Sequence, residues 1–183
     1  MYVWSRFIHM LATAKSRGAY QAGDASRLSF RCLPSDIDFN LHMNNAKYPM
    51  LADVGRIDIF KRSGMLDEGR KRGWAPIMGG VQCVFIREIK LWQKFELIST
   101  IETWEGAVVL GRHRFVFENG EPAAFLMTTA GVYDRRGRKF LSLEEVMDAV
   151  GMSAEQRAPT EAERAFMQSH KLLRDLGKEK CAA

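Results

Sequence analysis

Residues 36–48 of the chain read Asp36-Ile37-Asp38-Phe39-Asn40-Leu41-His42-Met43-Asn44-Asn45-Ala46-Lys47-Tyr48. This polar segment follows a predicted strand that Pro34 closes, and it leads into a predicted helix over residues 45–63. Asn44 is a suitable N-cap, Pro49 falls in the tolerated first turn, and Gly64 ends the helix. Apolar residues occupy more than one face of this helix, which indicates that other structure surrounds it.

The start of a buried helix is a chemically useful place for polar side chains. Its first turn offers unpaired backbone N–H groups and a partial positive charge, which can stabilise an oxyanion. A carboxylate a few residues upstream can act beside it as a nucleophile or a general base. The segment holds the carboxylates of Asp36 and Asp38, and it is therefore a candidate catalytic site.

The rest of the chain predicts one antiparallel sheet around that helix. Residues 3–17 have helical spacing, and apolar and polar residues alternate over residues 27–32 as in a strand. Four β-rich runs follow at residues 77–90, 95–104, 108–118 and 122–133. The breaks between them are short, which predicts a four-stranded antiparallel meander. Capping boxes at Ser142 and Thr160 predict two C-terminal helices. We therefore predict an α+β fold in which an antiparallel sheet wraps a long central helix.

The segment from Asp38 to Tyr48 also resembles the D-x-x-x-H-x-N-N-x-x-Y signature of the 4-hydroxybenzoyl-CoA-thioesterase-like branch of hot-dog-fold proteins. It is similar in particular to the thioesterase superfamily member six group, and the resemblance covers about residues 27–138. Shorter matches within this range are Leu33-Pro34-Ser35-Asp36, Gly55-Arg56, Arg72-Gly73-Trp74 and Phe95-Glu96-Leu97. The resemblance implies a hot-dog thioesterase domain at residues 27–141, an N-terminal amphipathic helical extension at residues 1–26 and a C-terminal helical extension at residues 142–183.

The resemblance also implies which residues carry the chemistry. Asp38 matches the catalytic carboxylate, and the backbone amide of Asn45 matches the group that polarises the thioester carbonyl. His42 belongs with them as a catalytic residue of the loop. The substrate side of the site is implied to include Asn44, Tyr48 and Asp53. Asp53 lies on the central helix, where other hot-dog branches carry their catalytic carboxylate.

Several of these residues also have a purely structural interpretation. Asp38 could form a turn by bonding its own backbone, and His42 could order the loop through hydrogen bonds. Tyr48 could face the core with a tethered hydroxyl. Asp53 could pair with Arg56 one turn along the helix, and Asp36 suits a loop or capping role.

The net charge of +5 raises the question of an anionic partner. Basic residues cluster at residues 70–72 and 135–139, where they fit either a solvated surface or a positive rim for the phosphates of coenzyme A. No nucleic-acid-binding motif accompanies them, so we expect no nucleic-acid partner. No metal-ligand spacing is present either, and we expect neither a metal nor another cofactor.

The cysteines and the hydropathy pattern bear on the compartment. Cys32 and Cys83 fall in apolar strand-like runs, and Cys181 makes the number of cysteines odd. This predicts buried free thiols, which fit a reducing compartment. We expect neither a signal peptide nor a membrane span, and hence a cytoplasmic protein. The amphipathic helix at residues 3–17 would suit a weak contact with a membrane surface.

These observations favour an acyl-CoA thioesterase that hydrolyses a fatty or aromatic acyl-CoA to the free acid and CoA. Hot-dog relatives share their sites between subunits, so the resemblance implies a homo-oligomer, either a dimer or a dimer of dimers. Two alternatives stay open. One is a non-catalytic acyl-binding or membrane-surface scaffold with a hot-dog fold. The other is a hot-dog hydratase or dehydratase, in which His42 would act together with a carboxylate.

Overall fold

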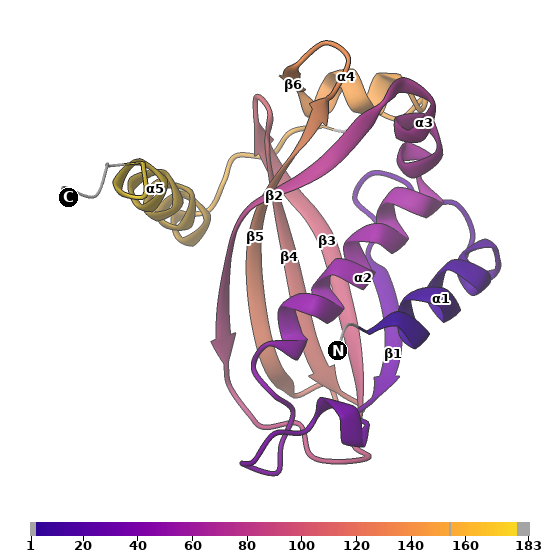
Figure 1. The fold of residues 1–183 in the computed structure, drawn as a ribbon, viewed down its shortest axis with the longest axis vertical. Helices are drawn as coiled ribbons and strands as arrows, with labels where there is room; N and C mark the ends of the chain where they lie inside the picture. The colour runs from indigo at the N-terminus through magenta and orange to yellow at the C-terminus, as the bar shows by residue number, and fades with distance from the viewer. Residues whose placement is uncertain (1–2, 154, 179–183) are drawn as a thin grey trace.

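A curled antiparallel sheet dominates the computed structural model, which describes residues 3–153 and 155–178 (Figure 1). Its strands are β1 (Ser26–Arg31), β2 (Trp74–Phe85), β3 (Lys94–Glu105), β4 (Val108–Phe117), β5 (Pro122–Asp134) and β6 (Lys139–Leu141). The order across the sheet is β1-β3-β4-β5-β2, with β6 paired to β5, and all pairs are antiparallel. The helix α2 (Lys47–Arg62) lies in the curl of the sheet. The predicted sheet around a central helix is therefore confirmed.

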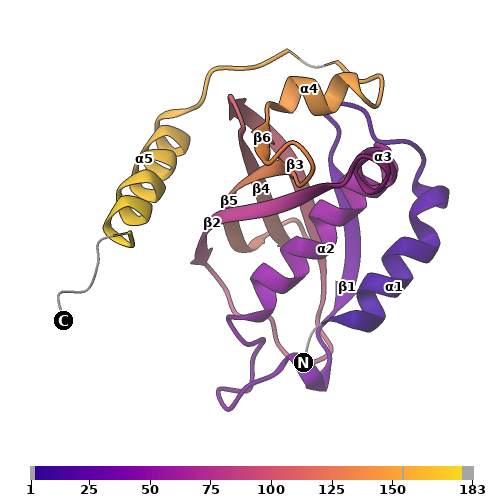
Figure 2. The same ribbon diagram turned by 45° about the horizontal axis from the view of Figure 1, so that its top comes forward.

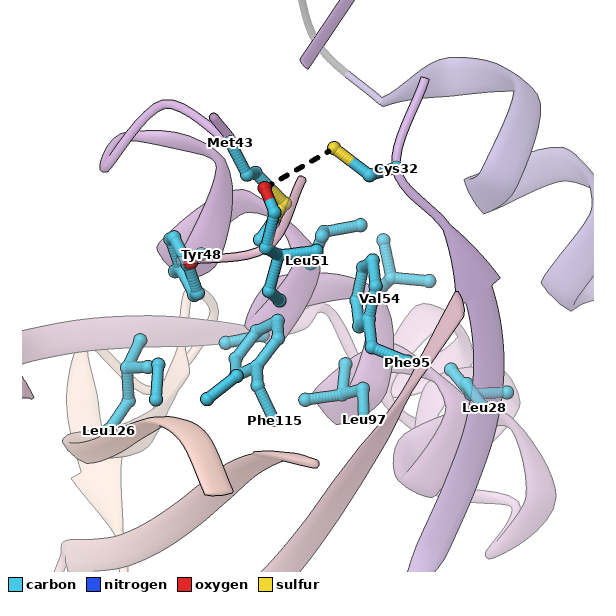
Figure 3. Close-up of a cluster of buried hydrophobic side chains, with 14 of the residues drawn as sticks. Leu28, Cys32, Met43, Tyr48, Leu51, Val54, Phe95, Leu97, Phe115 and Leu126 are labelled. Atoms are coloured by element: carbon cyan, nitrogen blue, oxygen red, sulfur yellow. Dashed lines mark hydrogen bonds between the residues drawn. The ribbon is translucent and has the colours of Figure 1, made fainter. Parts of the chain in front are cut away.

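Side chains of α2 and of the inner face of the sheet form the main hydrophobic core (Figure 3). Successive residues of a strand point to opposite faces, and the inward-facing ones meet the helix. The centre of this core includes Leu51, Val54, Leu97, Phe115 and Leu126. The helix approaches β3 so closely that a Cβ at Gly55 would collide with Ser99 Oγ. Glycine at this position is therefore a packing requirement.

The predicted four-stranded meander is wrong at its first connection. β3, β4 and β5 follow one another as neighbours, but β2 pairs with β5 and lies at the edge opposite to β1. β2 ends at Phe85, and residues 86–93 then cross between the two edges. The backbone N–H of Arg87 donates to Ala123 O at 3.0 Å, and that of Trp92 donates to Cys32 O, just after β1, at 2.9 Å. A sheet that curls around a helix brings its edges together, so a short connection can join strands that are not neighbours.

The N-terminal helix packs into the body of the domain. α1 (Trp4–Thr13) continues into the 3₁₀ segment η1 (Ala14–Arg17) and lies along α2 (Figure 2). Met10 is buried in the core, and Phe7 packs partly against it. Trp4 and Ile8 of the predicted apolar stripe are 60% and 62% exposed. The stripe therefore faces the core only in part.

Two of the remaining helices cover one end of the sheet. α3 (Met65–Arg72) follows α2 directly after Gly64 and adds an element that was absent from the prediction. α4 (Leu143–Asp148) begins at the predicted capping box, in which Ser142 Oγ accepts a hydrogen bond from the backbone N–H of Glu145. Figure 1 shows α3 and α4 at the same end as β6.

The last helix, α5 (Glu161–Leu176), lies outside the sheet beside β2 (Figures 1 and 2). It begins at the predicted capping box of Thr160. Phe166 packs against Leu110 and Met127, on the face of the sheet that points away from α2. No helix among the described residues is both long enough and apolar enough to cross a bilayer.

Candidate active site

Asp36 anchors the segment between β1 and α2. It closes a short 3₁₀ turn, η2 (Pro34–Asp36), and its side chain is buried. Arg6 of α1 donates to its two carboxylate oxygens at 3.0 and 2.5 Å. The backbone N–H of Leu33 donates to Oδ2 at 2.9 Å, and Lys47 Nζ lies 3.8 Å from Oδ1. One buried carboxylate thus joins α1, the loop and α2, in agreement with the expected structural role of Asp36.

Asp38 is held within the loop through both carboxylate oxygens. Oδ1 accepts a hydrogen bond from the backbone N–H of Asn40 at 2.9 Å, and Oδ2 accepts one from Asn44 Nδ2 at 3.2 Å. The backbone N–H of Leu41 closes the turn by donating to Asp38 O at 3.1 Å. This is the turn that the structural interpretation of Asp38 predicts. It fixes the direction of a carboxylate that is half-buried.

Asn44 connects this carboxylate to the start of α2. Its Oδ1 accepts a hydrogen bond from the backbone N–H of Ala46 at 2.9 Å, while its Nδ2 donates to Asp38. The prediction that Asn44 is the N-cap is wrong, because α2 begins at Lys47 and Ala46 occupies the cap position without a side-chain bond. The turn that Asn44 forms delays the helix by two residues.

Asn45 is exposed just ahead of α2. Its backbone N–H has no acceptor among residues 3–153 and 155–178. Because Asn45 lies next to the start of a helix, the partial positive charge of the helix N-terminus favours a negative group at this N–H. The Asn45 amide is therefore available to a hydrogen-bond acceptor such as an oxyanion.

The His42 ring lies in the same loop but is not joined to Asp38. Its Nδ1 is 3.3 Å from Met43 O, the carbonyl of the next residue. The contact between His42 and Asp38 runs through the backbone, where the Asp38 N–H donates to His42 O at 3.2 Å. In the described part of the chain, no hydrogen bond links the His42 ring to a carboxylate. The geometry favours the loop-ordering interpretation of His42.

Tyr48 lies in the core rather than at a surface (Figure 3). Its ring makes edge-to-face contacts with Phe85 and with Phe115, each with a centroid separation of 5.0 Å. Burial raises the pKa of the Tyr48 hydroxyl, which stays protonated. Tyr48 is therefore a core residue that packs at the start of α2, next to the loop.

Asp53 lies further along α2, about 12 Å from Asn45 at 1.5 Å per residue. It forms the ion pair with Arg56 that its structural interpretation predicts. Both residues line a cavity of about 440 Å³ between α1, α2 and β2, and no residue of the loop lines it. The structure thus brings Asp38, His42, Asn44 and Asn45 together in the loop and places Asp53 at a separate cavity.

A buried polar cluster beneath α2 was not indicated by the sequence. His113 Nδ1 is 2.8 Å from Ser99 Oγ, and its Nε2 is 3.3 Å from Thr128 Oγ1. Burial, together with the nearby charge of Arg56, lowers the pKa of His113 to about 3, so the ring is neutral. The strand alternation of residues 108–118 places His113 on the inner face, but nothing local indicates its partners.

Cys32 and Cys83 are thiols of low reactivity. Cys32 is free and buried, as predicted, and Cys83 is free but only half-buried, in contrast to the predicted burial. Burial raises the pKa of each thiol to about 11, so neither is an activated nucleophile. Cys181 lies outside the described residues. Within residues 3–153 and 155–178, no His, Cys, Asp and Glu side chains form a group of three that could hold a metal ion.

A known protein family matches the part of the chain that contains the Asp38 loop, α2 and most of the sheet. A sequence profile described as the thioesterase-like superfamily matches residues 32–159, which include the loop, α2 and every strand except β1. The chain belongs to the thioesterase-like superfamily. The implied hot-dog fold is thereby confirmed, together with the resemblance on which it rested.

Curated relatives of this thioesterase-like chain match only part of it. Protein THEM6 of Xenopus laevis is 34% identical over 84 residues, which are 46% of this chain and 41% of that protein. The probable thioesterase atnL of Emericella nidulans is 30% identical over 89 residues, which are 38% of this chain and 29% of that protein. The chain therefore spans less than half the length of either relative.

Solved structures of thioesterases share the fold. The probable thioesterase YbaW from Escherichia coli superposes with a TM-score of 0.64 at 19% identity and covers 68% of this chain and 96% of that chain. The DHNA-CoA thioesterase from Staphylococcus aureus gives a TM-score of 0.60 at 15% identity, over 85% of this chain and 97% of that chain. At these identities the likeness concerns the fold.

Proposed function

We propose that this chain hydrolyses acyl-CoA thioesters, converting a fatty or aromatic acyl-CoA to the free acid and CoA. Membership of the thioesterase-like superfamily supports the class of reaction. The observation that carries the proposal is the Asn44 side chain, which hydrogen-bonds both the Asp38 carboxylate and the Ala46 N–H. It keeps a carboxylate and the available N–H of Asn45 within one short turn.

In the proposed reaction, the thioester carbonyl oxygen accepts a hydrogen bond from the Asn45 N–H. The helix start favours the negative charge that develops on this oxygen. Asp38 attacks the carbonyl carbon, or it takes a proton from a water that attacks. The C–S bond breaks, and its electron pair leaves on the CoA thiolate. After direct attack by Asp38, water hydrolyses the resulting anhydride and restores the carboxylate.

Two copies of the chain form the proposed active unit. β2 is an edge strand whose outer side pairs with no strand in the described residues, and none of its 12 residues is charged. Such an edge invites pairing with another strand. Phe39 and Leu41, at the tip of the catalytic loop, are 91% and 77% exposed. Apolar side chains placed so openly suit a site that a second subunit covers.

The test compares two carboxylates by measuring the release of CoA thiol. Asp38→Asn preserves size and most hydrogen bonding but removes the charge, so kcat should fall by about 10²–10⁴ with a modest change in KM. Asp53→Asn is the matched control on α2 and should keep most of the turnover. Loss of turnover in Asp53→Asn, with Asp38→Asn near wild type, would move the catalytic carboxylate to α2.

A non-catalytic scaffold at a membrane surface is the second candidate. The exposed side chains of Trp4, Ile8, Phe39 and Leu41 favour it. Liposome co-sedimentation that Ile8→Ser and Leu41→Ser abolish, in a protein that releases no thiol from any acyl-CoA, would establish the scaffold and contradict the enzyme. Substitutions are preferable to removing α1, because Met10 belongs to the core.

A further inference from the structure

A cavity of about 440 Å³ lies between α1, α2 and β2, apart from the loop that holds Asp38. Its apolar lining comes from all three elements and includes Trp4, Phe7, Ile57, Phe60, Ile77 and Met78. The volume falls within the range of roughly 300–1,000 Å³ that small-molecule pockets occupy. The cavity is therefore large enough for part of a substrate.

The cavity follows the axis of α2. Asp53, Arg56, Ile57 and Phe60 line it, and their spacing of three, four and seven residues forms one stripe on a helix. Seven residues correspond to about 10 Å along the helix. A groove of this length suits a chain better than a compact ring. The flexible side chain of Met78 can adapt to chains of different length.

The charges in the wall are already paired. Asp53 and Arg56 form an ion pair, and Arg56 Nη1 also contacts Met78 Sδ at 3.3 Å. Phosphate groups are bound by Arg and Lys donors that are free to bond them. The wall therefore favours the uncharged end of a thioester over its nucleotide end.

α1 is fixed firmly enough to serve as one wall of this cavity. Its first turn is held by Arg6, which bonds the buried Asp36. Just beyond its other end, Arg17 Nη2 lies 2.6 Å from Oδ1 of the buried Asp58 on α2. Because Asp36 also anchors the loop, the Arg6 contact fixes the position of this wall relative to Asp38.

We propose that this cavity binds the aliphatic acyl chain of the substrate, and that Trp4 and Phe7 set the chain length it accepts. Their rings pack edge to face, with centroids 6.0 Å apart, and form the part of the wall that α1 contributes. The inference rests on the proposed thioester hydrolysis and adds to it a substrate class. It makes the N-terminal helix a specificity element.

Hydrolysis of acyl-CoAs of increasing chain length tests this inference. For the wild type, kcat/KM should rise by about fourfold for each methylene buried, until the cavity is full. Phe7→Ala enlarges the cavity, so the optimum should move to longer chains. Ile8→Ala is the matched control, because Ile8 is exposed on the same helix and does not line the cavity. Equal chain-length profiles for Phe7→Ala and the wild type overturn the proposal.

A binding measurement separates the cavity from the chemistry. The probe is ω-bromododecanoate, whose bromine quenches nearby tryptophan fluorescence. Quenching should be lost in Trp4→Phe and kept in Trp92→Phe, since Trp92 is exposed in the 86–93 connection and does not line the cavity. If quenching depends on Trp4 but the protein hydrolyses no acyl-CoA, the result supports acyl-chain binding in the cavity and contradicts the proposed hydrolysis.

Two other outcomes would contradict acyl-chain binding in the cavity without contradicting the proposed thioester hydrolysis. One is hydrolysis by a protein whose quenching persists in Trp4→Phe. The other is a Phe7→Ala variant whose self-association changes while its chain-length profile does not, because the groove would then be a contact between subunits. Thermal unfolding of each variant shows that the comparison is made between folded proteins.

Discussion

The buried carboxylate of Asp36 is balanced by Arg6 and, at longer range, by Lys47. Asp36→Asn keeps the shape of the side chain but leaves Arg6 in the core without its full counter-charge. Removing one partner of a buried ion pair costs roughly 3–5 kcal/mol. We expect the free energy of unfolding to fall by about this amount in urea denaturation.

An exposed ion pair on the same protein supplies the control. Arg27 Nη1 lies 2.8 Å from Glu96 Oε2 between β1 and β3, and both side chains are in contact with water. Arg27→Gln should therefore change the free energy of unfolding by less than about 1 kcal/mol. A cost for Asp36→Asn no greater than that for Arg27→Gln would show that Asp36 does not lock α1 to the loop.

For single residues, the sequence predicts hydrogen bonds and ion pairs with residues that are close in the chain. The Asp38 turn and the Asp53–Arg56 pair were both foreseen, because each involves residues less than one helical turn apart. The partner of Asp36 lies 30 positions away, at Arg6. A contact of that kind depends on how α1 packs, which no local pattern reveals. The resemblance assigned the Asn45 amide to the start of the helix, but Asn45 lies just ahead of α2, because the helix begins later than predicted.

Among the elements, α5 is held to the sheet by the buried charge of Glu163 in addition to the packing of Phe166. Glu163 accepts bonds from Arg112 Nη2 at 3.0 Å and from Arg157 at 2.7 and 2.6 Å. Glu163→Gln can still complete the capping box with Thr160, but it removes the charge. We expect α5 to detach more often, so that its backbone amides exchange faster in hydrogen-exchange measurements. Glu161→Gln, at an exposed position in the same turn, should leave exchange unchanged.

Acid should have the same effect as the Glu163 substitution. Hydrogen bonds from Arg157 lower the pKa of Glu163 from 4.5 to about 2. A carboxyl group with a lowered pKa contributes stability above its unfolded pKa, and that contribution is lost as the pH falls through the folded value. Docking of α5 should therefore weaken between about pH 4.5 and pH 2 in the wild type, with no such step in Glu163→Gln. A wild-type helix that exchanges at the variant's rate at neutral pH would contradict this role of the charge.

Helices that begin at a capping box were predicted, and pairings across the sheet were predicted less well. The capping boxes of α4 and α5 each span only four residues of sequence, and both were predicted correctly. α3 was missed, although Asp67 and Glu68 in its first turn and basic residues in its last turn are typical of a helix. The pairing of β2 with β5 arises from the curl of the sheet, so the short break after β2 was misleading.

Over the whole molecule, the two basic clusters lie together at one end of the sheet. Arg136 Nη2 donates to Lys71 O at 3.1 Å, and the backbone N–H of Arg135 donates to Gly73 O at 3.2 Å. This basic end, residues 70–72 and 135–139, adjoins the start of β2. The loop that holds Asp38 adjoins the end of β2, where Phe85 contacts Tyr48. At about 3.3 Å per residue, the strand separates them by at most roughly 36 Å, so in the proposed reaction a CoA at Asp38 lies far from the basic end of its own chain.

If β2 pairs antiparallel with β2 of a second copy, the start of one strand lies beside the end of the other. The basic end of each subunit is then next to the Asp38 loop of its partner, where it can bind the CoA phosphates. KM should therefore rise with salt, since exposed charges are screened beyond about 8–10 Å at physiological ionic strength. Val84→Lys, which places a charge on the exposed edge, should give a monomer in light scattering that hydrolyses poorly although it is folded.

Mixed dimers decide whether the phosphates are bound by the same subunit or by its partner. Arg70→Gln combined with Arg135→Gln should raise KM and leave kcat nearly unchanged, because both side chains are exposed and distant from Asp38. In a dimer of this double variant with Asp38→Asn, one site joins an intact Asp38 to the intact basic end of the other subunit. Binding across the interface predicts the wild-type KM and about half of the wild-type turnover. Binding within one subunit predicts the raised KM of the double variant. A wild type that is monomeric at micromolar concentration would exclude binding across the interface.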